Sequence, residues 1–240
     1  MRIVGPGRAG RSFEAALLQV GVQVELLDRD ADVRGAAVGV DVVLLATPDR
    51  VIAETAQRIE PASAVVMHCS GATGLDALAP HREQQGRVAS LHPLMALPDP
   101  TTGARRLMGG GWFAVAGHGV ARELAEMLGG RSFEVADRHR GAYHATAAIG
   151  ANHLVALLGQ VERLAAGIGV PFEAFLDLAR GSFDDVVAQG AAAALTGPAA
   201  RGDHETIDVH RRALPADEVP VYDALAQAAT KLARLRDSGN

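Results

Sequence analysis

Lysine and cysteine are almost absent from this chain of 240 residues. Lys231 is the only lysine, so arginine supplies nearly all of the positive charge and lysine-based catalysis has a single candidate near the C-terminus. Cys69 is the only cysteine, which excludes an internal disulfide framework and is typical of a reducing compartment. No C-x-x-C or H-E-x-x-H spacing occurs, so we expect no metal site.

The chain also lacks an uninterrupted apolar run of about 18 residues, the length that spans a membrane. The nearest approach, residues 142–161, is interrupted by His144, Asn152, His153 and Gln160. Residue 1 leads into a short apolar run and then glycines, which differs from a secretory signal peptide. The net charge of −5 gives no reason to expect nucleic acid as a partner. We therefore expect a cytoplasmic protein with neither a membrane nor a nucleic-acid partner.

The first part of the chain alternates between strand-like and helix-like segments. Residues 41–46 form a continuous apolar run of the kind that is buried in a parallel sheet, and residues 12–20 have apolar side chains at helical spacing. This alternation predicts an α/β fold with a doubly wound parallel sheet of the Rossmann type. Its strands are expected at residues 3–4, 22–27, 41–46, 64–68, 87–91, 113–116 and 133–135.

The pattern changes near Asp137. Strand signals stop there, and an alanine-rich helix follows over residues 138–169. The sequence thus predicts a Rossmann-like domain at residues 1–137 and an all-α domain at residues 138–240. Further helices are expected at residues 172–189, 205–213 and 219–236, and loops at residues 98–103 and 195–203.

A glycine-rich loop precedes the first predicted helix; its residues are Gly5, Pro6, Gly7, Arg8, Ala9 and Gly10. The G-x-G-x-x-G spacing gains weight from the strand before it, the helix after it and an acidic residue at the end of the next strand. Gly5 permits a tight turn, Gly7 lets the backbone approach a pyrophosphate, and Gly10 lets the helix pack close to the strand. The helix N-terminus favours phosphates. The loop therefore predicts a dinucleotide site, the alternative being a glycine turn without a ligand.

The residues after the second strand bear on the choice of dinucleotide. Asp28 would accept hydrogen bonds from the adenosine ribose, which favours NAD over NADP because a 2′-phosphate would meet a carboxylate. Arg29 could instead hold that phosphate or stack on adenine, so NADP stays open. A solvated strand end without a ligand is the other interpretation.

Three later strands are expected to end at the same crevice, where ligands of such sheets bind. Thr47 and Pro48 would flank the middle of the cofactor, and Ser70 and Gly71 would lie near the nicotinamide. His92 follows the next strand and is the first titratable group placed to reach a substrate. Histidine exchanges protons near neutral pH, although a His-Pro turn can also be purely structural.

Polar residues also interrupt the alanine-rich helix. Asn152 and His153 lie in an otherwise apolar stretch, so they either face the cofactor or are satisfied core residues. Asn152 is the preferred candidate for orienting the substrate or the nicotinamide. His144 lies two turns earlier, and for this residue a contact within an interface is the preferred interpretation.

A second polar cluster follows the expected loop at residues 195–203. Arg201 could pair bidentately with a substrate carboxylate. Asp203 is placed to cap the next helix, and Thr206 and His210 fall on or near the same face. These residues are candidates for substrate binding, the alternative being a loop and helix that brace the domain or a dimer.

The N-terminal half resembles the cofactor domain of the 6-phosphogluconate dehydrogenase superfamily, which includes ketopantoate reductase, pyrroline-5-carboxylate reductase and prephenate dehydrogenase. The whole chain resembles one branch, which joins a Rossmann-like domain to a helical domain of unknown function. The residues that carry this likeness are His68-Cys69-Ser70-Gly71, Leu91-His92-Pro93-Leu94, Ala151-Asn152-His153-Leu154, and residues 196–203 with Thr206, Ile207 and His210.

This resemblance implies a nicotinamide-dependent oxidoreductase that forms a homodimer through its helical domains and closes on its substrate between the two domains. Ser70 and His92 resemble the serine and histidine with which prephenate dehydrogenase polarises a hydroxyl group, so they join Asn152 and His153 as catalytic candidates. The catalytic lysine of hydroxyacid dehydrogenases and ketopantoate reductase has no counterpart here, since Lys231 lies outside any matching motif.

The sequence thus predicts an NAD(P)-dependent oxidoreductase. Its substrate is expected to be a small, anionic hydroxy or oxo acid, with the direction of hydride transfer left open. Two alternatives remain from the residues alone. One is an imine reductase, which needs less acid catalysis from the protein. The other is a redox-inactive protein that senses NAD(P) or binds a different ligand in the crevice.

Overall fold

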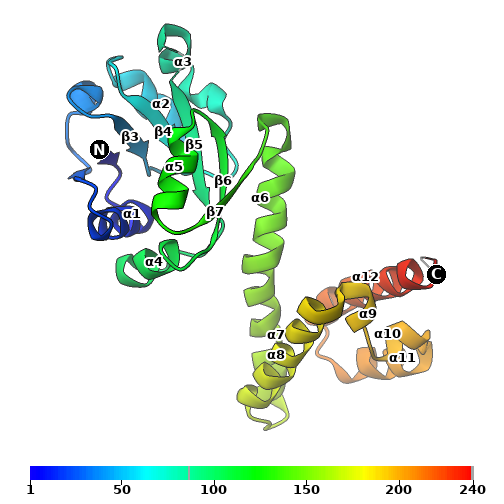
Figure 1. The fold of residues 1–240 in the computed structure, drawn as a ribbon. Helices are drawn as coiled ribbons and strands as arrows, with labels where there is room; N and C mark the ends of the chain where they lie inside the picture. The colour runs from blue at the N-terminus through cyan, green and yellow to red at the C-terminus, as the bar shows by residue number, and fades with distance from the viewer. Residues whose placement is uncertain (86, 239–240) are drawn as a thin grey trace. The chain divides into compact units, whose positions relative to one another are not determined.

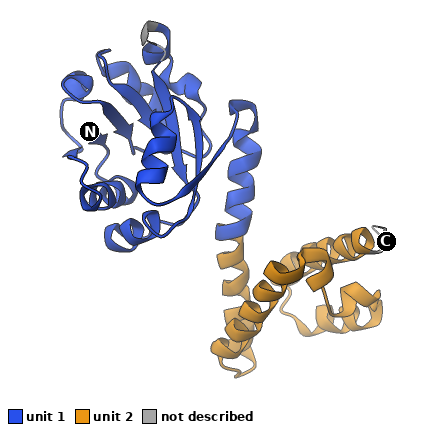
Figure 2. Ribbon diagram, in the orientation of Figure 1, with its two compact units in different colours: residues 1–151 blue, residues 152–240 orange. Residues whose placement is uncertain are grey.

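The computed structural model describes residues 1–85 and 87–238. The chain divides into two compact units, Met1–Ala151 and Asn152–Asn240 (Figure 2). Unit 1 includes the sheet and the first helix after it, whereas unit 2 is helical. The domain boundary near residue 137 stays a prediction, because a division of the chain by compactness does not establish where one functional domain ends and the next begins.

A seven-stranded sheet forms unit 1, with the order β2-β1-β3-β4-β5-β6-β7 (Figure 1). The predicted Rossmann-type α/β fold is confirmed, and each expected strand is present. The strands are β1 (Arg2–Val4), β2 (Glu25–Leu27), β3 (Val42–Leu45), β4 (Val65–His68), β5 (Val88–Pro93), β6 (Trp112–Gly117) and β7 (Arg131–Glu134).

The last two strands, β6 and β7, run opposite to the other five, which differs from the prediction of a wholly parallel sheet. β6 runs antiparallel to β5, with His92 opposite Ala114, while the remaining neighbours are parallel. Both strands are apolar runs, and an apolar run reads the same in either direction. The sequence pattern therefore found β6 without its orientation. The carboxyl ends of β1, β3, β4 and β5 still meet at one edge of the sheet.

Helices cover both faces of the sheet. On one face Phe13 and Leu107 pack against Leu44, and α1 lies beside α4 (Figure 1). On the other face Ile52 packs against Val43. The helices of unit 1 are α1 (Arg8–Gln19), α2 (Ile52–Arg58), α3 (Ala79–Gln85), α4 (Pro100–Leu107), α5 (Val120–Met127) and α6 (Arg140–Ala148).

Helix α4 begins inside the segment expected to be a loop at residues 98–103. Asp99 caps it by accepting a hydrogen bond from the Thr102 amide, at 2.9 Å. Pro100 occupies the first helical turn, where a missing N–H group costs nothing. The expectation of a loop was wrong because Pro-Asp-Pro is also a helix start signal.

The single helix expected over residues 138–169 is built from three segments. Helix α6 is followed by η5 (Ile149–His153), a π-helical turn, and then by α7 (Leu154–Gly167). The extra residue in a π turn shifts the side-chain register, and such turns often occur at functional sites. No helix in the described part of the chain is long and apolar enough to cross a membrane.

The helices expected at residues 172–189, 205–213 and 219–236 are present, but the expected loop at residues 195–203 contains the short helix α10 (Pro198–Arg201). Pro198 lies in its first turn, where a missing N–H group costs nothing, and Gly202 ends it in the left-handed conformation. Glu218 joins the end of the chain to α7, because its backbone oxygen accepts from Gln160 at 2.9 Å and its carboxylate pairs with Arg163 at 2.7 Å. The remaining helices are α8 (Phe172–Gln189), α9 (Ala191–Ala194), α10 (Pro198–Arg201), α11 (His204–Ala213) and α12 (Val219–Ser238).

Candidate active site

The glycine loop turns between β1 and α1. Gly5 has φ +111°, which favours glycine, and a Cβ at this position would lie 2.7 Å from the Ala46 oxygen. A Cβ on Gly10 would collide with the Gly5 carbonyl oxygen. A Cβ on Gly7, in contrast, would meet nothing within 4 Å. Gly5 and Gly10 therefore allow α1 to pack close to the strands, and Gly7 leaves the space beside its backbone open.

The geometry of this loop fits a dinucleotide. Gly7 caps α1 without a side-chain hydrogen bond, and the first turn carries no acidic residue. The amide groups of that turn are thus free to meet an anion, which the helix dipole favours. At the end of β3, the hydroxyl oxygen of Thr47 is buried without a hydrogen-bond partner among the described residues. A buried hydroxyl of this kind is satisfied when a polar ligand group reaches it.

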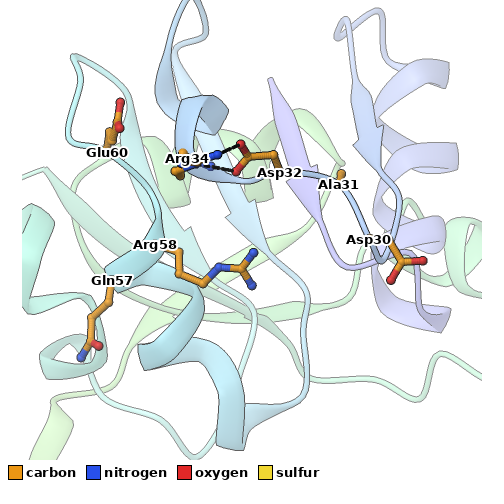
Figure 3. Close-up of a pocket in the computed structure, with 7 residues that line it drawn as sticks. All are labelled: Asp30, Ala31, Asp32, Arg34, Gln57, Arg58 and Glu60. Carbon is orange, nitrogen blue, oxygen red and sulfur yellow. Dashed lines mark hydrogen bonds and ion pairs between the residues drawn. The ribbon is translucent and has the colours of Figure 1, made fainter.

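Asp28 and Arg29 follow β2 and are exposed. Nearby, Arg34 donates to Asp32 at 2.7 Å, and these hydrogen bonds hold the pKa of the Asp32 carboxyl below its usual value. Carboxylates and guanidinium groups both lie in this region, so its charge does not decide between NAD and NADP. The preference for NAD stays a prediction from Asp28. A hollow of about 670 Å³ is lined by Asp30, Ala31, Asp32, Arg34, Gln57, Arg58 and Glu60 (Figure 3).

His92 lies near the carboxyl end of β5 and contacts α6. Its Nδ1 atom is 2.7 Å from the hydroxyl oxygen of Tyr143. The ring of His144 lies 6.3 Å away, centroid to centroid. A Cβ on Gly71 would lie 2.8 Å from Nε2 of His92 and 2.9 Å from Cδ2 of His144. The two imidazoles therefore converge over Gly71, where the sequence placed the nicotinamide.

Burial decides the charge of these groups. It lowers the pKa of His92 to about 4, with further lowering by His144 and by the charge of Arg140. Burial also raises the pKa of Tyr143 to about 12. Both side chains are consequently neutral near pH 7, so the pair offers one imidazole proton and one phenol proton.

Ser70 is buried, and its hydroxyl is engaged within its own loop. The oxygen accepts from the amides of Ala72 and Thr73, at 3.2 and 3.0 Å, and donates to the Thr73 hydroxyl at 2.9 Å. Short hydroxyl side chains close turns in this way. The structure thus gives Ser70 a role in shaping the loop after β4, and its predicted contact with cofactor or substrate stays a prediction.

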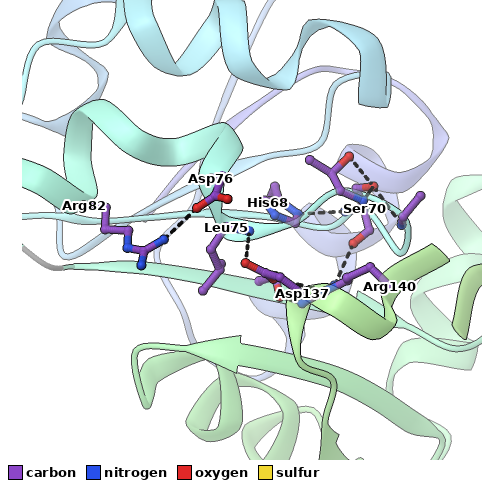
Figure 4. Close-up of polar contacts among 10 residues, drawn as sticks. His68, Ser70, Leu75, Asp76, Arg82, Asp137 and Arg140 are labelled. Carbon is purple, nitrogen blue, oxygen red and sulfur yellow. Dashed lines mark hydrogen bonds and ion pairs between the residues drawn. The ribbon is translucent and has the colours of Figure 1, made fainter. Parts of the chain in front are cut away.

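Arg140 is the largest fully buried side chain among the described residues. Its guanidinium donates to the Ser90 hydroxyl and, at 3.3 Å, to the Ser70 carbonyl oxygen (Figure 4). The Asp137 carboxylate lies 3.8 Å from Nε and also accepts from the Leu75 amide at 3.0 Å. One buried charge therefore joins β5, the loop after β4 and the start of α6.

Sequence reasoning missed Tyr143 and Arg140 as parts of this cluster. Both lie on α6, within the alanine-rich stretch where only the histidines and Asn152 drew attention. A signal was available: Tyr143 stands next to His144, and tyrosine occurs only twice in the chain. Cys69 is an unpaired thiol, and burial raises its pKa to about 12, which makes it a poor nucleophile.

The remaining predicted residues belong to unit 2. Asn152 and His153 are exposed and lie in η5. Asp203 caps α11, as expected, by accepting from the Thr206 amide at 3.0 Å and from its hydroxyl at 2.8 Å. These bonds hold the pKa of Asp203 below its usual value. Thr206 and Asp203 thus satisfy each other, and their contact with substrate stays a prediction.

Two further predicted residues of unit 2 differ in how they are held. Arg201 is exposed at the end of α10, 4.0 Å from the Asp203 carboxylate, and such a long surface pair leaves the guanidinium accessible. His210 contacts the Tyr222 hydroxyl through Nδ1, at 2.9 Å. The exposed guanidinium of Arg201 therefore stays accessible to an anion, and its contact with substrate stays a prediction.

Known proteins resemble this chain both in its C-terminal half and over nearly its whole length. Residues 114–229 match DUF2520, a domain of unknown function. This match covers just under half of the chain and includes α6 with Arg140 and Tyr143. No curated protein matches the chain.

Solved structures resemble the chain over nearly its whole length. Protein TM1727 from Thermotoga maritima is 23% identical, with a TM-score of 0.73 over 98% of this chain and 99% of that one. A reductive aminase from Aspergillus terreus is 14% identical, with a TM-score of 0.71 over 100% and 98%. Pyrroline carboxylate reductase from Plasmodium falciparum is 11% identical, with a TM-score of 0.63 over 97% of each.

These comparisons confirm the resemblance expected from the sequence. Part of the chain resembles a domain of unknown function, and the whole chain has the fold of NAD(P)-binding, Rossmann-like oxidoreductases that carry a helical C-terminal part. At identities this low, the likeness to solved structures shows the fold. The chemistry has to be argued from the residues of this chain.

Buried neutral histidines give unit 1 a dependence on pH. Burial lowers the pKa of His68 and of His92 to about 4, below the ordinary value of 6.5. Between these values the unfolded chain binds protons that the folded chain does not bind. We predict that the free energy of unfolding falls as the pH is lowered from about 6.5 to about 4. Urea denaturation followed by the fluorescence of Trp112, the only tryptophan, measures this in unit 1.

A His68→Asn variant separates this effect from other titrations. The His68 side chain accepts from the Ser70 amide at 3.2 Å, and asparagine keeps an acceptor while it removes the titrating ring. On acidification the free energy of unfolding should fall less in the variant than in the parent. Above about pH 7.5 the two proteins should show the same pH dependence. Equal acid sensitivity of variant and parent would show that His68 is not held neutral by the fold.

Proposed function

We propose that this protein is an NAD(P)-dependent oxidoreductase that acts on a small, anionic hydroxy or oxo acid. One observation carries the proposal: Gly7, Thr47 and His92 stand at the carboxyl ends of three strands of one sheet. Ligands of doubly wound sheets bind at this edge. The sheet thereby brings three groups to the same edge: the open backbone at Gly7, the unsatisfied hydroxyl of Thr47 and the neutral imidazole of His92.

The roles of the residues follow from their atoms. The amides at the start of α1 would bind the pyrophosphate, and Thr47 would satisfy its hydroxyl on the cofactor. A bound nicotinamide supplies or accepts the hydride. His92 would hold a hydrogen bond to the oxygen of the reacting carbon, in a site where burial strengthens that bond.

The residues of unit 2 complete the proposal on the substrate side. Arg201 would bind a substrate carboxylate through two parallel hydrogen bonds, and Asn152 would orient the reacting group. A C=N substrate is the second candidate, because the fold is shared with a reductive aminase and because an iminium carbon needs no proton from the protein. Asp28 supports NAD over NADP as the cofactor.

A charge placed at Gly7 tests the cofactor site. We predict that Gly7→Asp weakens binding of NADH and NADPH at least about tenfold, because its carboxylate would face the pyrophosphate. The fold should tolerate the change, since a Cβ at Gly7 meets nothing within 4 Å and aspartate is a favourable helix cap. Fluorescence titration of the reduced dinucleotide measures the affinity.

Gly7→Asn is the matched control, equal in size and without the charge. It should retain most of the affinity that Gly7→Asp loses. If the parent protein binds neither dinucleotide at millimolar concentration, the dinucleotide site does not exist. If both variants weaken binding equally, the pyrophosphate does not lie at the start of α1.

Loss of the His92 ring tests the proposed chemistry. We predict that His92→Ala lowers kcat/KM for a keto acid by about 10²–10⁴-fold, the usual contribution of a positioned proton donor or acceptor. The assay follows NADH or NADPH oxidation across a panel of small keto acids and cyclic imines. A His92→Ala enzyme with full activity on its best substrate would remove His92 from the mechanism.

His118→Asn is the control for this substitution. His118 follows β6 at the end that pairs with the start of β5, which is the end opposite His92. Its Nδ1 atom accepts from the Val120 amide at 3.2 Å, a contact that asparagine can replace. The control should keep the activity of the parent. No activity from the parent on any substrate would favour a protein that binds NAD(P) without turnover.

The apolar surface of α8 supports a homodimer through unit 2. None of its residues is buried, and Phe183, Val186 and Val187, which share one helical face, are 64%, 41% and 71% exposed. Large apolar side chains gathered on one helix are typical of an interface. We predict that Phe183→Asp converts a dimer into a monomer in analytical ultracentrifugation, while Asp184→Asn does not. A parent protein that sediments as a monomer would contradict the dimer.

A further inference from the structure

The contact between His92 and Tyr143 fixes more than a position. Nδ1 of His92 lies 2.7 Å from the Tyr143 hydroxyl oxygen, and the two rings meet edge to face at 5.5 Å and 89°. Phe133 packs against the tyrosine ring at 5.9 Å. The phenol is thus held on α6 against strand β7 and cannot leave the imidazole without breaking this packing.

The chemistry of the two groups gives the direction of the hydrogen bond. A neutral imidazole has one N–H donor and one bare nitrogen that accepts strongly, whereas a phenol is a good donor and a weak acceptor. Among the described residues, Nδ1 of His92 is the only acceptor recorded for the Tyr143 hydroxyl. Donation by the phenol therefore satisfies both groups, and the reverse bond leaves the phenol proton without a protein acceptor.

We propose that Tyr143 is the positioning residue of the site: its hydroxyl donates to Nδ1 of His92 and so places the imidazole proton on Nε2. The hydrogen bond at one ring nitrogen decides which nitrogen carries the proton. This inference rests on the proposed function, because it states how His92 is prepared for that reaction.

The tautomer selects the class of substrate. Nε2 is the ring atom that faces Gly71, and no hydrogen bond from the described residues reaches it. With its proton on Nε2, His92 presents a donor to the substrate. A donor polarises the oxygen of a C=O group or the nitrogen of a C=N group, while removal of a proton from an alcohol needs an acceptor. In its resting tautomer the site therefore presents a hydrogen-bond donor to a carbonyl or imine. If the Nε2 proton passes to the reduced substrate, the Tyr143 hydroxyl proton passes to Nδ1, so that the imidazole stays neutral and the phenolate regains a proton from solvent.

The surroundings hold the ring in this orientation. The imidazole already packs against Gly71 beside His144, so it has no room to move closer to the loop. The buried charge of Arg140 lies one helical turn before Tyr143 and disfavours a second proton on the imidazole. Hence the structure favours the neutral ring with a single proton.

Nitrogen-15 NMR of the histidine rings in the full chain, without cofactor or substrate, tests this inference. In the parent protein at about pH 7.5, His92 should show a protonated Nε2 and an accepting Nδ1. Tyr143→Phe should remove the bias and give a mixture of the two tautomers. Kinetically, the same variant should lower kcat for reduction with little change in KM, since it alters the donor and leaves substrate contacts in place.

Tyr222→Phe is the matched control, because the chain has only two tyrosines and Tyr222 makes the same kind of contact with His210, at 2.9 Å. It should change the signals of His210 and leave those of His92 unaltered. A parent protein with the His92 proton on Nδ1 would overturn the proposal, even if Tyr143→Phe fails to fold. An unchanged tautomer in a folded Tyr143→Phe protein would also overturn it. Failure of the oxidoreductase proposal would appear separately, as absent dinucleotide binding.

Discussion

The candidate site depends on one buried guanidinium. Arg140 donates to Ser90 on β5 and to the carbonyl oxygen of Ser70 after β4, and it lies 3.8 Å from the Asp137 carboxylate. Burial of a charge costs free energy, which these contacts offset in part, and removal of one partner would leave the rest of the cluster unsatisfied. The same contacts fix the start of α6 against the sheet, so Tyr143 one turn later meets His92.

The glycine loop at the same edge of the sheet depends on backbone alone. At Gly5 and Gly10 the helix and strands approach so closely that no side chain fits, and this leaves the start of α1 open at Gly7. The glycine loop and the His92–Tyr143 pair are complementary in their chemistry. In the proposed function, amide groups and a helix dipole would hold the phosphates, while the neutral His92–Tyr143 pair would offer a proton to the substrate. A fold shared with reductases is consistent with this division.

The sequence could predict what depends on local patterns. Apolar runs and alternating segments located the strands, the spacing of Gly5, Gly7 and Gly10 located the tight turn, and Asp203 was correctly interpreted as a helix cap. No local pattern in the sequence indicated that β6 runs antiparallel to β5. The contact between Tyr143 and His92 could not be predicted, since the two residues are 51 positions apart in sequence and only the tertiary fold joins them.

Ser70 shows that a residue with a catalytic pattern in the sequence can be engaged elsewhere in the fold. Ser70 has the residue type and the strand-end position of a catalytic group, yet its hydroxyl is bound by the amides of Ala72 and Thr73. Which neighbours satisfy a polar side chain is decided by backbone geometry that the sequence does not display. The roles of Asn152 and Arg201 likewise depend on which groups meet them when substrate binds.

A crystal structure of the protein with a nicotinamide dinucleotide tests the central claim most directly. The account predicts the pyrophosphate against the backbone of Gly7 at the start of α1, a polar cofactor atom at the Thr47 hydroxyl, and the nicotinamide ring beside Gly71, with Nε2 of His92 on its reactive side. A dinucleotide bound away from this edge of the sheet, for instance in the hollow lined by Asp32 and Arg58, would contradict it.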